Sequence, residues 1–299
     1  MDTLARAGLI NEGKTKKIFA VVGDPRHVVV EYKNTITAFD DPSFTKEFAT
    51  KAKYSTTITS RVFEMLNAKG IPTSYVRQLS DTEFLGLACT MIPLEVVVRR
   101  YAFGSYLKRR PEFSVAEGEP PHRFDPPVVE FFLKTTKGGL KDEDGTMLVE
   151  DLDPQKGEED PFIENPREGT WRLMHPKTPG EEPSASLNRT IDAERVLKGA
   201  TIDEMESAIV RTLETLEEFF AKNDFKLVDF KIEFGRTKDS RVVISDVIDN
   251  DSWRIWPGGD KSRMKDKQVY RNLQNVTPEA LKEIGGNYAF VAEATKKFI

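Results

Sequence analysis

The sequence has little of several residue types that proteins use for chemistry or for anchoring. Its 299 residues include one cysteine and three histidines. A single cysteine excludes an internal disulfide framework and a zinc site built on cysteines. No apolar run approaches the ~20 residues of a membrane helix, and residues 1–17 lack the apolar stretch of a signal peptide. We therefore expect a cytoplasmic protein that does not interact with membranes.

A strong excess of charge of one sign is also lacking, because the net charge is only −5. Residues 135–190 hold thirteen acidic and seven basic side chains, so the remainder carries a charge of +1. No basic stripe with interleaved aromatic residues is present, and we predict no nucleic-acid partner. Residues 135–190 also hold six prolines and six glycines. This composition is typical of long surface excursions with one short hairpin, or of a mobile flap.

Strand-like and helix-like periodicities alternate along the chain and predict an α+β fold. The length allows two domains, which we place at residues 1–90 and 91–299, with the acidic segment 135–190 inserted in the second. The predicted strands are residues 16–22, 27–32, 73–79, 83–91 and 94–101, with a connection at Pro93. The predicted helices are residues 48–69, 201–222 and 265–273, and a last one that Thr277 caps.

The stretch Leu227–Trp256 carries the strongest local pattern. Apolar residues from Val228 to Phe234 alternate with Asp229, Lys231 and Glu233, which places the three charged side chains on one face of a strand. A second strand, residues 241–248, carries Asp246 roughly opposite Glu233 if the two strands pair as a hairpin. Two carboxylates ~5 Å apart repel by about 3 kcal/mol at an effective dielectric of 20. The pattern therefore predicts positive charge between them, of which Lys231 supplies a part and a hard cation such as Mg²⁺ the rest. The alternative is a solvated strand face with an ordinary salt bridge.

Residues 8–15, GLINEGKT, match the phosphate-binding P-loop pattern literally. That motif needs a buried strand before it and a helix after it, whereas the following KKIFAVV is typical of a strand. We therefore reject the P-loop. The remaining interpretation is a tight turn in which Gly13 permits close approach of a phosphate and Lys14 and Lys16 neutralise it. A solvated lysine-rich turn is the alternative.

Two further basic segments are candidate anion sites. Arg99 lies at a strand end, and the pair Gly104–Ser105 lies at a predicted helix start. Lys267 and Arg271 are four residues apart and share a helix face. A solvated basic face is the alternative for each.

Taken together, these segments resemble the phosphoribosylaminoimidazole-succinocarboxamide synthases (SAICAR synthetases) of purine biosynthesis. The matching pieces occur in the family's order: EGKTKKIF, MIPLEVVVRRYAFGSYLKR, VEFFLKT, DPFI, LVDFKIEFG, SDVIDNDSWRIW and KDKQVYR. The resemblance implies a small N-terminal and a larger C-terminal α+β domain, with antiparallel sheets that flank an active-site cleft. It implies an ATP- and Mg²⁺-dependent ligase that joins L-aspartate to aminoimidazole carboxylate ribotide. The partners would be these small molecules, and the oligomeric state stays open, a homo-oligomer included.

The resemblance also implies residue roles. Lys14 and Lys16, with Gly13, would bind ATP phosphates, and the chain near Met91 would contact adenine. Glu233 and Asp246 resemble the acidic residues of the Mg²⁺ site. Positions near the reacting ribotide and aspartate are matched by Lys134, Asp160, Asp229 and Lys231. Residues that hold the substrate carboxylate and ribotide phosphate are matched by Arg99, Gly104, Ser105, Arg254, Lys267 and Arg271.

The chain departs from the compact family pattern between Lys134 and Asp160 and between Glu164 and Ile191, where it carries extra sequence. Asp151 and Asp153 are therefore alternatives to Asp160. The residues taken without the resemblance leave two rival functions open. One is a small-molecule or lipid-head-group kinase with the same ATP site, and the other is a nucleotide-binding scaffold that does not turn ATP over.

Overall fold

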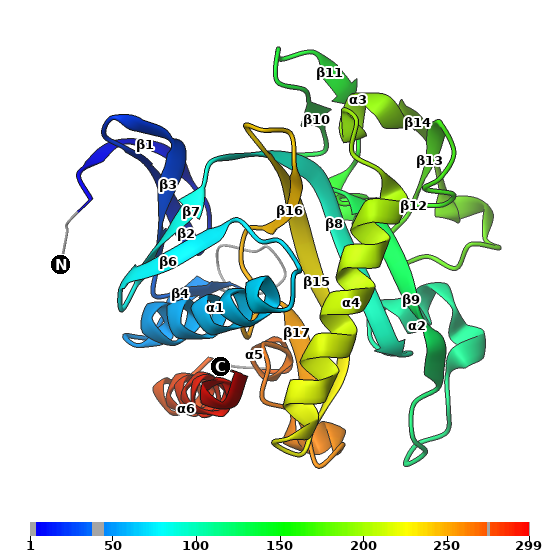
Figure 1. Ribbon diagram of the computed structural model, residues 1–299. Coiled ribbons are helices and arrows are strands. Elements are labelled where there is room, and N and C mark those ends of the chain that lie inside the picture. Colours follow the sequence, from blue (N-terminus) through cyan, green and yellow to red (C-terminus); the bar gives the residue numbers. More distant parts are fainter. Residues whose placement is uncertain (1–3, 38–44, 274–275, 299) are drawn as a thin grey trace. The chain divides into compact units, whose positions relative to one another are not determined.

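A computed structural model describes residues 4–37, 45–273 and 276–298 (Figure 1). The chain forms two compact units that interleave along the sequence. The first comprises Met1–Thr90, Glu214–Leu227 and Gly235–Ile299, and the second comprises Met91–Leu213 and Val228–Phe234. The boundary at residue 90 coincides with the expected one. Residues 214–227 and 235–299 group with the first unit, which differs from the expected single C-terminal domain.

The first unit contains an antiparallel sheet with the strand order β1-β2-β3-β7-β6. Its strands are β1 (Arg6–Glu12), β2 (Lys16–Val21), β3 (Asp24–Tyr32), β6 (Tyr75–Ser80) and β7 (Glu83–Leu87). The strands expected at residues 16–22 and 27–32 are confirmed. The second begins three residues earlier, at Asp24, because Gly23, with a φ of +72°, completes the turn directly before it. A two-stranded ribbon joins β4 (Thr35–Thr37) and β5 (Thr45–Glu47).

Two long helices complete the first unit. Helix α1 (Lys51–Ala68) buries Ile58, Val62 and Leu66 completely, as their spacing of four predicted, and Gly70 follows it with a φ of +70°. Helix α6 (Pro278–Ala294) begins where expected, since the amide of Ala280 donates to Oγ1 of Thr277 at 3.2 Å. The helix expected at residues 265–273 is shorter: α5 covers only Gln268–Arg271. Short 3₁₀ turns lie at Lys261–Arg263 and Thr295–Phe298.

The second unit is built on an antiparallel sheet with the strand order β14-β13-β12-β9-β8-β15. Its strands are β8 (Cys89–Tyr101), β9 (Arg123–Leu133), β12 (Phe162–Ile163), β13 (Thr170–Met174), β14 (Ser186–Asp192) and β15 (Phe225–Thr237). Pro93 does not interrupt β8, contrary to expectation. Pairing with β9 runs from Leu94 onward, so the N–H that Pro93 lacks is not needed there, while its carbonyl accepts from the amide of Lys134 at 2.9 Å.

The acidic segment 135–190 is only partly the surface excursion that its composition predicts. A short hairpin, β10 (Leu140–Lys141) with β11 (Met147–Val149), is present as expected. However, β12, β13 and the start of β14 belong to the main sheet, and Ile163, Trp171 and Leu173 are at most 1% exposed. The interpretation of the whole segment as a flap was therefore wrong. Its apolar residues are few, but they are placed at alternating strand positions that face the core.

Helices in the second unit are short apart from α4. They are α2 (Ser105–Arg109) and α3 (Ala193–Leu197), with 3₁₀ turns at Pro111–Phe113, Pro154–Lys156 and Pro183–Ala185. Helix α4 (Ile202–Ala221) begins in the second unit and ends in the first. Its predicted cap is confirmed, because the amide of Glu204 donates to Oγ1 of Thr201 at 3.1 Å. Among the described residues no helix is long and apolar enough to span a membrane.

Strand β15 confirms the alternating pattern. Val228, Phe230, Ile232 and Phe234 are at most 1% exposed, and the charged residues between them share the other face. The ends of β15 belong to the first unit, where β16 (Val242–Ser245) and β17 (Trp253–Pro257) pair with this strand. The strand expected at residues 241–248 is shorter, so Asp246 lies just beyond the end of β16 and not within it.

Candidate active site

The turn that contains Gly13 and Lys14 connects strands β1 and β2 of the first unit. A strand follows this turn, as expected, and not the helix that a P-loop needs. The amide of Gly13 donates to the carbonyl of Lys16 at 2.9 Å, and the carbonyl of Lys14 accepts from Oγ1 of Thr35 at 2.6 Å. The ammonium of Lys16 forms an ion pair with the carboxylate of Asp246. Asp246 has a φ of +63°, a conformation that an aspartate adopts at a cost. The first unit thus joins a candidate phosphate ligand directly to a candidate metal ligand.

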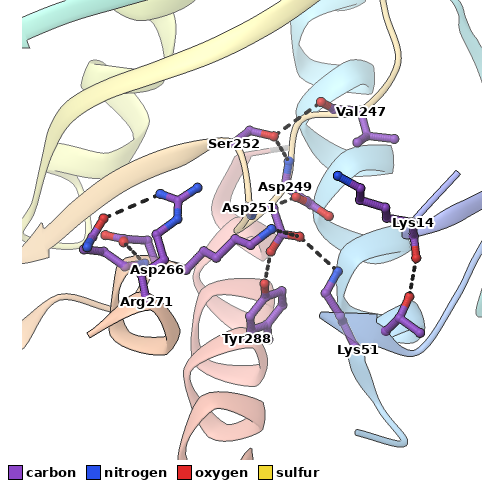
Figure 2. A network of polar contacts seen from close by, with 12 residues as sticks. Lys14, Lys51, Val247, Asp249, Asp251, Ser252, Asp266, Arg271 and Tyr288 are labelled. Carbon is purple, nitrogen blue, oxygen red and sulfur yellow. Dashed lines mark hydrogen bonds and ion pairs between the residues drawn. The ribbon is translucent and has the colours of Figure 1, made fainter. Parts of the chain in front are cut away.

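The loop after β16 carries two more acidic residues in a polar network (Figure 2). Asp249 is buried, and Asp251 is partly buried. Asp251 contacts three side chains: Nζ of Lys51 at 3.2 Å, Nζ of Lys267 at 3.3 Å, and the hydroxyl of Tyr288. Burial alone would raise the pKa of Asp251, but the charges of Lys267 and Lys51 outweigh it and lower the pKa below its ordinary value. Asp251 is therefore ionised at neutral pH.

The single turn of α5 presents two candidate phosphate ligands. The amide of Arg271 donates to the carbonyl of Lys267 at 3.2 Å, so the two residues stand one helical turn apart, as predicted. Buried Asp266 holds this turn, because its carboxylate accepts from the amides of Gln268 at 2.8 Å and Ile255 at 3.0 Å. Figure 2 shows Arg271, Asp266 and Asp251 in one cluster. Arg254 is half-buried on the neighbouring strand β17.

In the second unit each charged residue of β15 has a partner of opposite charge. Asp229 accepts from Nη1 of Arg99 at 2.7 Å, Lys231 pairs with Glu95 of β8, and Glu233 accepts from Nζ of Lys134 at 2.7 Å. Burial would lower the pKa of Lys134, but Glu233 and Glu95 outweigh it and raise the pKa. The pKa of Lys231 is raised for the same reason, with Glu95 as the opposing charge. Both lysines are therefore protonated at neutral pH.

Arg99 lies deeper than its predicted role requires. It is 3% exposed, and Nε donates to Glu130 of β9 at 2.6 Å while Nη1 binds Asp229. Arg109 of α2 also pairs with Glu130. Burial would raise the pKa of Glu130, yet the two arginines lower it. These contacts support a role for Arg99 in holding Asp229, which differs from the predicted direct contact with a substrate carboxylate.

Asp160 lies beside Lys134, although its assignment from the sequence left alternatives. Oδ1 accepts from the amide of Thr135 at 2.8 Å, and the amide of Asp160 donates to Oγ1 of Thr135 at 3.0 Å. The charge of Asp160 also contributes to the raised pKa of Lys134. Asp153 instead caps a 3₁₀ turn by accepting from the amide of Gln155, and Asp151 is exposed. The geometry therefore favours Asp160 over both alternatives.

The Gly104–Ser105 pair lies at the start of α2, as predicted. Gly104 has a φ of +63° and a ψ of −130°, a conformation that favours glycine. Tyr106, the next residue of the helix, packs its ring against Phe124 with centroids 5.3 Å apart, which fixes the position of Ser105. Met91 lies on β8 at the boundary between the units and is 40% exposed.

The predicted site residues are divided between the two units. The first holds Gly13, Lys14, Lys16, Asp246, Arg254, Lys267 and Arg271, and the second holds Met91, Arg99, Gly104, Ser105, Lys134, Asp160, Asp229, Lys231 and Glu233. Glu233 and Asp246, the candidate metal ligands, therefore belong to different units. Within the described part of the chain no three His, Cys, Asp or Glu residues form a group that could hold a metal ion.

Sequence reasoning missed several residues of these networks. They are Lys51, Glu95, Glu130, Asp249, Asp251, Asp266 and Tyr288. Most of them lie within the segments quoted above: Asp249 and Asp251 within SDVIDNDSWRIW, Glu130 within VEFFLKT, Glu95 within MIPLEVVVRRYAFGSYLKR and Asp266 within KDKQVYR. Lys51 and Tyr288 had no comparable signal, because each occupies a position in a helix where long side chains are common.

Comparison with known proteins connects this arrangement to a family. The family model for SAICAR synthetase matches residues 9–148 and 177–285. The chain belongs to the SAICAR synthetase family. A phosphoribosylaminoimidazole-succinocarboxamide synthase of Chloroflexus aggregans is 39% identical over 97% of this chain and 96% of its own length.

Solved structures of SAICAR synthetases share the fold. One in complex with ADP is 26% identical, covers 94% of this chain and 97% of its own, and has a TM-score of 0.66. Another, from Pyrococcus horikoshii OT3, is 26% identical, covers 92% of this chain and 97% of its own, and has a TM-score of 0.63. These likenesses confirm the predicted family and α+β fold.

The SAICAR synthetase family model leaves out residues 149–176. This stretch overlaps both regions where extra sequence was expected, and it contains Asp160. The position of Asp160 therefore rests on its contacts with Thr135 and not on the family match.

Proposed function

We propose that this protein is a phosphoribosylaminoimidazole-succinocarboxamide synthase. It would join L-aspartate to the carboxylate of 5-amino-1-(5-phospho-D-ribosyl)imidazole-4-carboxylate and release ADP and phosphate. The observation that carries the proposal is the match to the Chloroflexus aggregans enzyme, which spans 97% of this chain at 39% identity. The protein would work in the cytoplasm on these small molecules during purine biosynthesis.

The chemistry requires activation of a carboxylate, because direct attack of an amine on it would expel oxide. In the proposed reaction a carboxylate oxygen of the ribotide attacks the γ-phosphorus of ATP and ADP leaves. The amine of aspartate then attacks the acyl carbon, loses a proton, and phosphate departs with that carboxylate oxygen. Such a reaction depends on positioning and on neutralising charge in the transition state. A chain with one cysteine and three histidines is suited to it, since no nucleophilic side chain is needed.

We assign ATP binding to three residues of the first unit, Gly13, Lys14 and Lys16, and to the chain at Met91, near the start of β8. Lys14 and Lys16 would bind the phosphates, with the turn at Gly13 permitting close approach, and the chain at Met91 would contact adenine. The ADP-bound relative supports nucleotide binding in this fold. Lys16 would exchange its ion pair with Asp246 for contact with phosphate oxygens.

Glu233 and Asp246 are the residues that would hold Mg²⁺. Their donor set fits this ion, because Mg²⁺ is usually bound by one or two carboxylates together with substrate phosphates. Both side chains are partly exposed, Glu233 by 20% and Asp246 by 31%, so solvent and phosphate can reach them. When bound, Mg²⁺ would neutralise charge on the transferring phosphoryl group.

The ribotide and aspartate are assigned to the remaining charged residues. Lys134 and Lys231 stay protonated, so they would stabilise the developing negative charge on the acyl group. Asp229, fixed by Arg99, and Asp160, fixed by Thr135, would orient the amine. The ribotide phosphate is assigned to Ser105, Arg254, Lys267 and Arg271.

Release of ADP with each substrate omitted in turn tests the proposal. We expect ADP release to require ATP, ribotide and aspartate together. A kinase would release ADP with ribotide alone, since it needs no amine. A nucleotide-binding scaffold would bind ATP and release no ADP under any condition. Either of these two results would contradict the proposed function.

A further inference from the structure

Lys51 is a lysine in an unfavourable place. It is the first residue of α1 and is 0% exposed, so its ammonium group is removed from water. Burial of a charge is costly unless it is paired. A cation in the first turn of a helix also opposes the helix dipole. Both effects disfavour a lysine here, so its contacts must compensate for them.

The compensating contact is with Asp251. Nζ of Lys51 lies 3.2 Å from Oδ2 of Asp251, and Nζ of Lys267 lies 3.3 Å from the same oxygen atom. The hydroxyl of Tyr288 donates to the other oxygen, Oδ1. In Figure 2, Lys51 approaches Asp251 from α1 and Tyr288 approaches it from α6. One carboxylate is therefore shared by a fully buried ammonium and by a candidate ligand of the ribotide phosphate.

This sharing controls how much positive charge Lys267 can offer to an anion. While Lys51 is present, its charge offsets much of the charge of Asp251. Without Lys51, the carboxylate would act on Lys267 alone and would compete with an incoming phosphate. With the ionisation of Asp249 and Asp251 unchanged, the cluster around Asp251 would then be more negative by one unit charge. Because Lys51 is fully buried, it can exert this effect without touching the substrate.

We propose that Lys51 is a positioning residue that sets, through Asp251, the affinity of the Lys267–Arg271 site for the ribotide phosphate. The proposal rests on the proposed function, because it takes that phosphate as the occupant of the site. It assigns a role in substrate binding to three residues that sequence reasoning missed: Lys51, Asp251 and Tyr288. A purely structural role for Lys51 is the alternative.

Steady-state kinetics of three variants distinguish the two roles. Lys51→Met should raise the KM for ribotide on the order of tenfold, as expected from one unit charge roughly 10 Å away at an effective dielectric of 20. The KM for ATP should change much less. Lys53→Met is the matched control, because Lys53 lies in the same first turn but is 53% exposed and pairs with Asp81. We expect this control to keep wild-type kinetics.

The double variant Lys51→Met/Asp251→Asn provides the decisive comparison. It removes one positive and one negative charge, so it restores the net charge around Lys267. We expect its KM for ribotide to return at least halfway, on a logarithmic scale, toward the wild-type value. A structural role predicts no recovery, since the second change removes a further native contact. A double variant with a KM no better than that of Lys51→Met would overturn the proposal.

Tyr288→Phe keeps the inference testable if Lys51→Met fails to fold. The change removes the hydrogen bond to Oδ1 of Asp251 but keeps the ring that packs against Phe48 at 5.5 Å. Asp251 should then bind Lys267 more strongly, and we expect the KM for ribotide to rise about threefold. An unchanged KM in this folded variant would overturn the proposal.

Lys267→Met separates failure of this inference from failure of the proposed function. A wild-type protein without aspartate-dependent release of ADP would contradict the proposed function itself, and the inference with it. If the wild type is active and Lys267→Met raises the KM for ribotide, the site is assigned correctly. An unchanged KM in folded Lys51→Met would then overturn the role of Lys51 alone.

Discussion

Asp249 and Asp251 lie two positions apart in one loop, and their pKa values shift in opposite directions. The pKa of Asp251 is lowered because Lys267 and Lys51 outweigh the effect of burial. The pKa of Asp249, which is 1% exposed, is raised by burial and then by the charge of Asp251. Asp251 therefore stabilises the folded state when it is ionised, whereas ionisation of Asp249 destabilises it. Such a cost is common in residues retained for function.

Replacement of Asp249 should therefore stabilise the protein. We expect Asp249→Asn to raise the free energy of unfolding at pH 7, because the side-chain amide carries no charge and its oxygen can still accept from the amide of Asp251, a contact of 2.8 Å in the wild type. The folded pKa of Asp249 lies above the unfolded one, so wild-type stability falls relative to the variant as pH rises above the ordinary value of 3.8.

Urea unfolding of both proteins at pH 5 and pH 7 measures this difference. The stabilising effect of the variant should be at least as large at pH 7 as at pH 5. A variant that is less stable than the wild type at pH 7 would show that Asp249 is stabilised in its ionised form.

Asp246 should be essential for turnover but not for folding. Its strained backbone, with a φ of +63°, and its ion pair with Lys16 are the features of a residue kept for chemistry. We expect Asp246→Asn to lower kcat on the order of 10²-fold or more and to alter the Mg²⁺ dependence of the rate. Asp239→Asn is the control in the same hairpin, because Asp239 is 63% exposed and pairs only locally, with Arg241. Wild-type kcat and Mg²⁺ dependence in Asp246→Asn would exclude Asp246 as a metal ligand.

At the scale of elements, strands β8, β9 and β15 are tied together by buried charges. Glu130 of β9 binds Arg99 of β8 and Arg109 of α2, and Arg99 also binds Asp229 of β15. All four side chains are at most 6% exposed. Removal of one partner leaves an uncompensated charge in a water-poor environment, and this costs more than the pair contributes.

Glu130→Gln should therefore destabilise the protein by about 3–5 kcal/mol. The folded pKa of Glu130 is lowered, so its contribution is complete above the ordinary value of 4.5 and is lost as pH falls through the folded pKa. Glu112→Gln is the matched control, because Glu112 is 53% exposed and pairs with Arg110. Denaturant unfolding at pH 7 measures both variants. A loss below 1 kcal/mol in Glu130→Gln would mean that the buried network is not stabilising.

The elements that sequence predicted best are those whose periodicity agrees with their packing. Helices α1 and α4 each bury one stripe, and β15 buries Val228, Phe230, Ile232 and Phe234 at alternating positions, so the apolar pattern and the structure coincide there. The predictions failed where tertiary contacts override local signals. Pro93 lies in β8 because no strand bond is needed at its nitrogen. Strands β12 and β13 are short pieces in an acidic, proline-rich context, and they form because neighbouring strands pair with them.

At the scale of the whole molecule, the sequence motifs named charged residues that contact one another in the structure, and the roles of these residues stay predictions. Motif segments carried Lys16, Asp246, Lys134 and Glu233, and the structure pairs these residues two by two. The interleaved units were not predictable, because β15 belongs in part to each of them and no change in composition marks the crossings. Buried residues such as Lys51 and Glu130 were also missed, because their partners are distant in the sequence. Lys51 contacts Asp251, and Glu130 contacts Arg99 and Arg109, only in the folded chain.

The proposed reaction of the whole molecule predicts the fate of a single oxygen atom. If the ribotide carboxylate is phosphorylated before aspartate attacks, one of its oxygens must leave with phosphate. Ribotide labelled with ¹⁸O in this carboxylate should therefore yield labelled inorganic phosphate and unlabelled ADP when ATP and aspartate are present. Labelled AMP, or unlabelled phosphate despite formation of the amide product, would contradict an acyl-phosphate reaction in this protein.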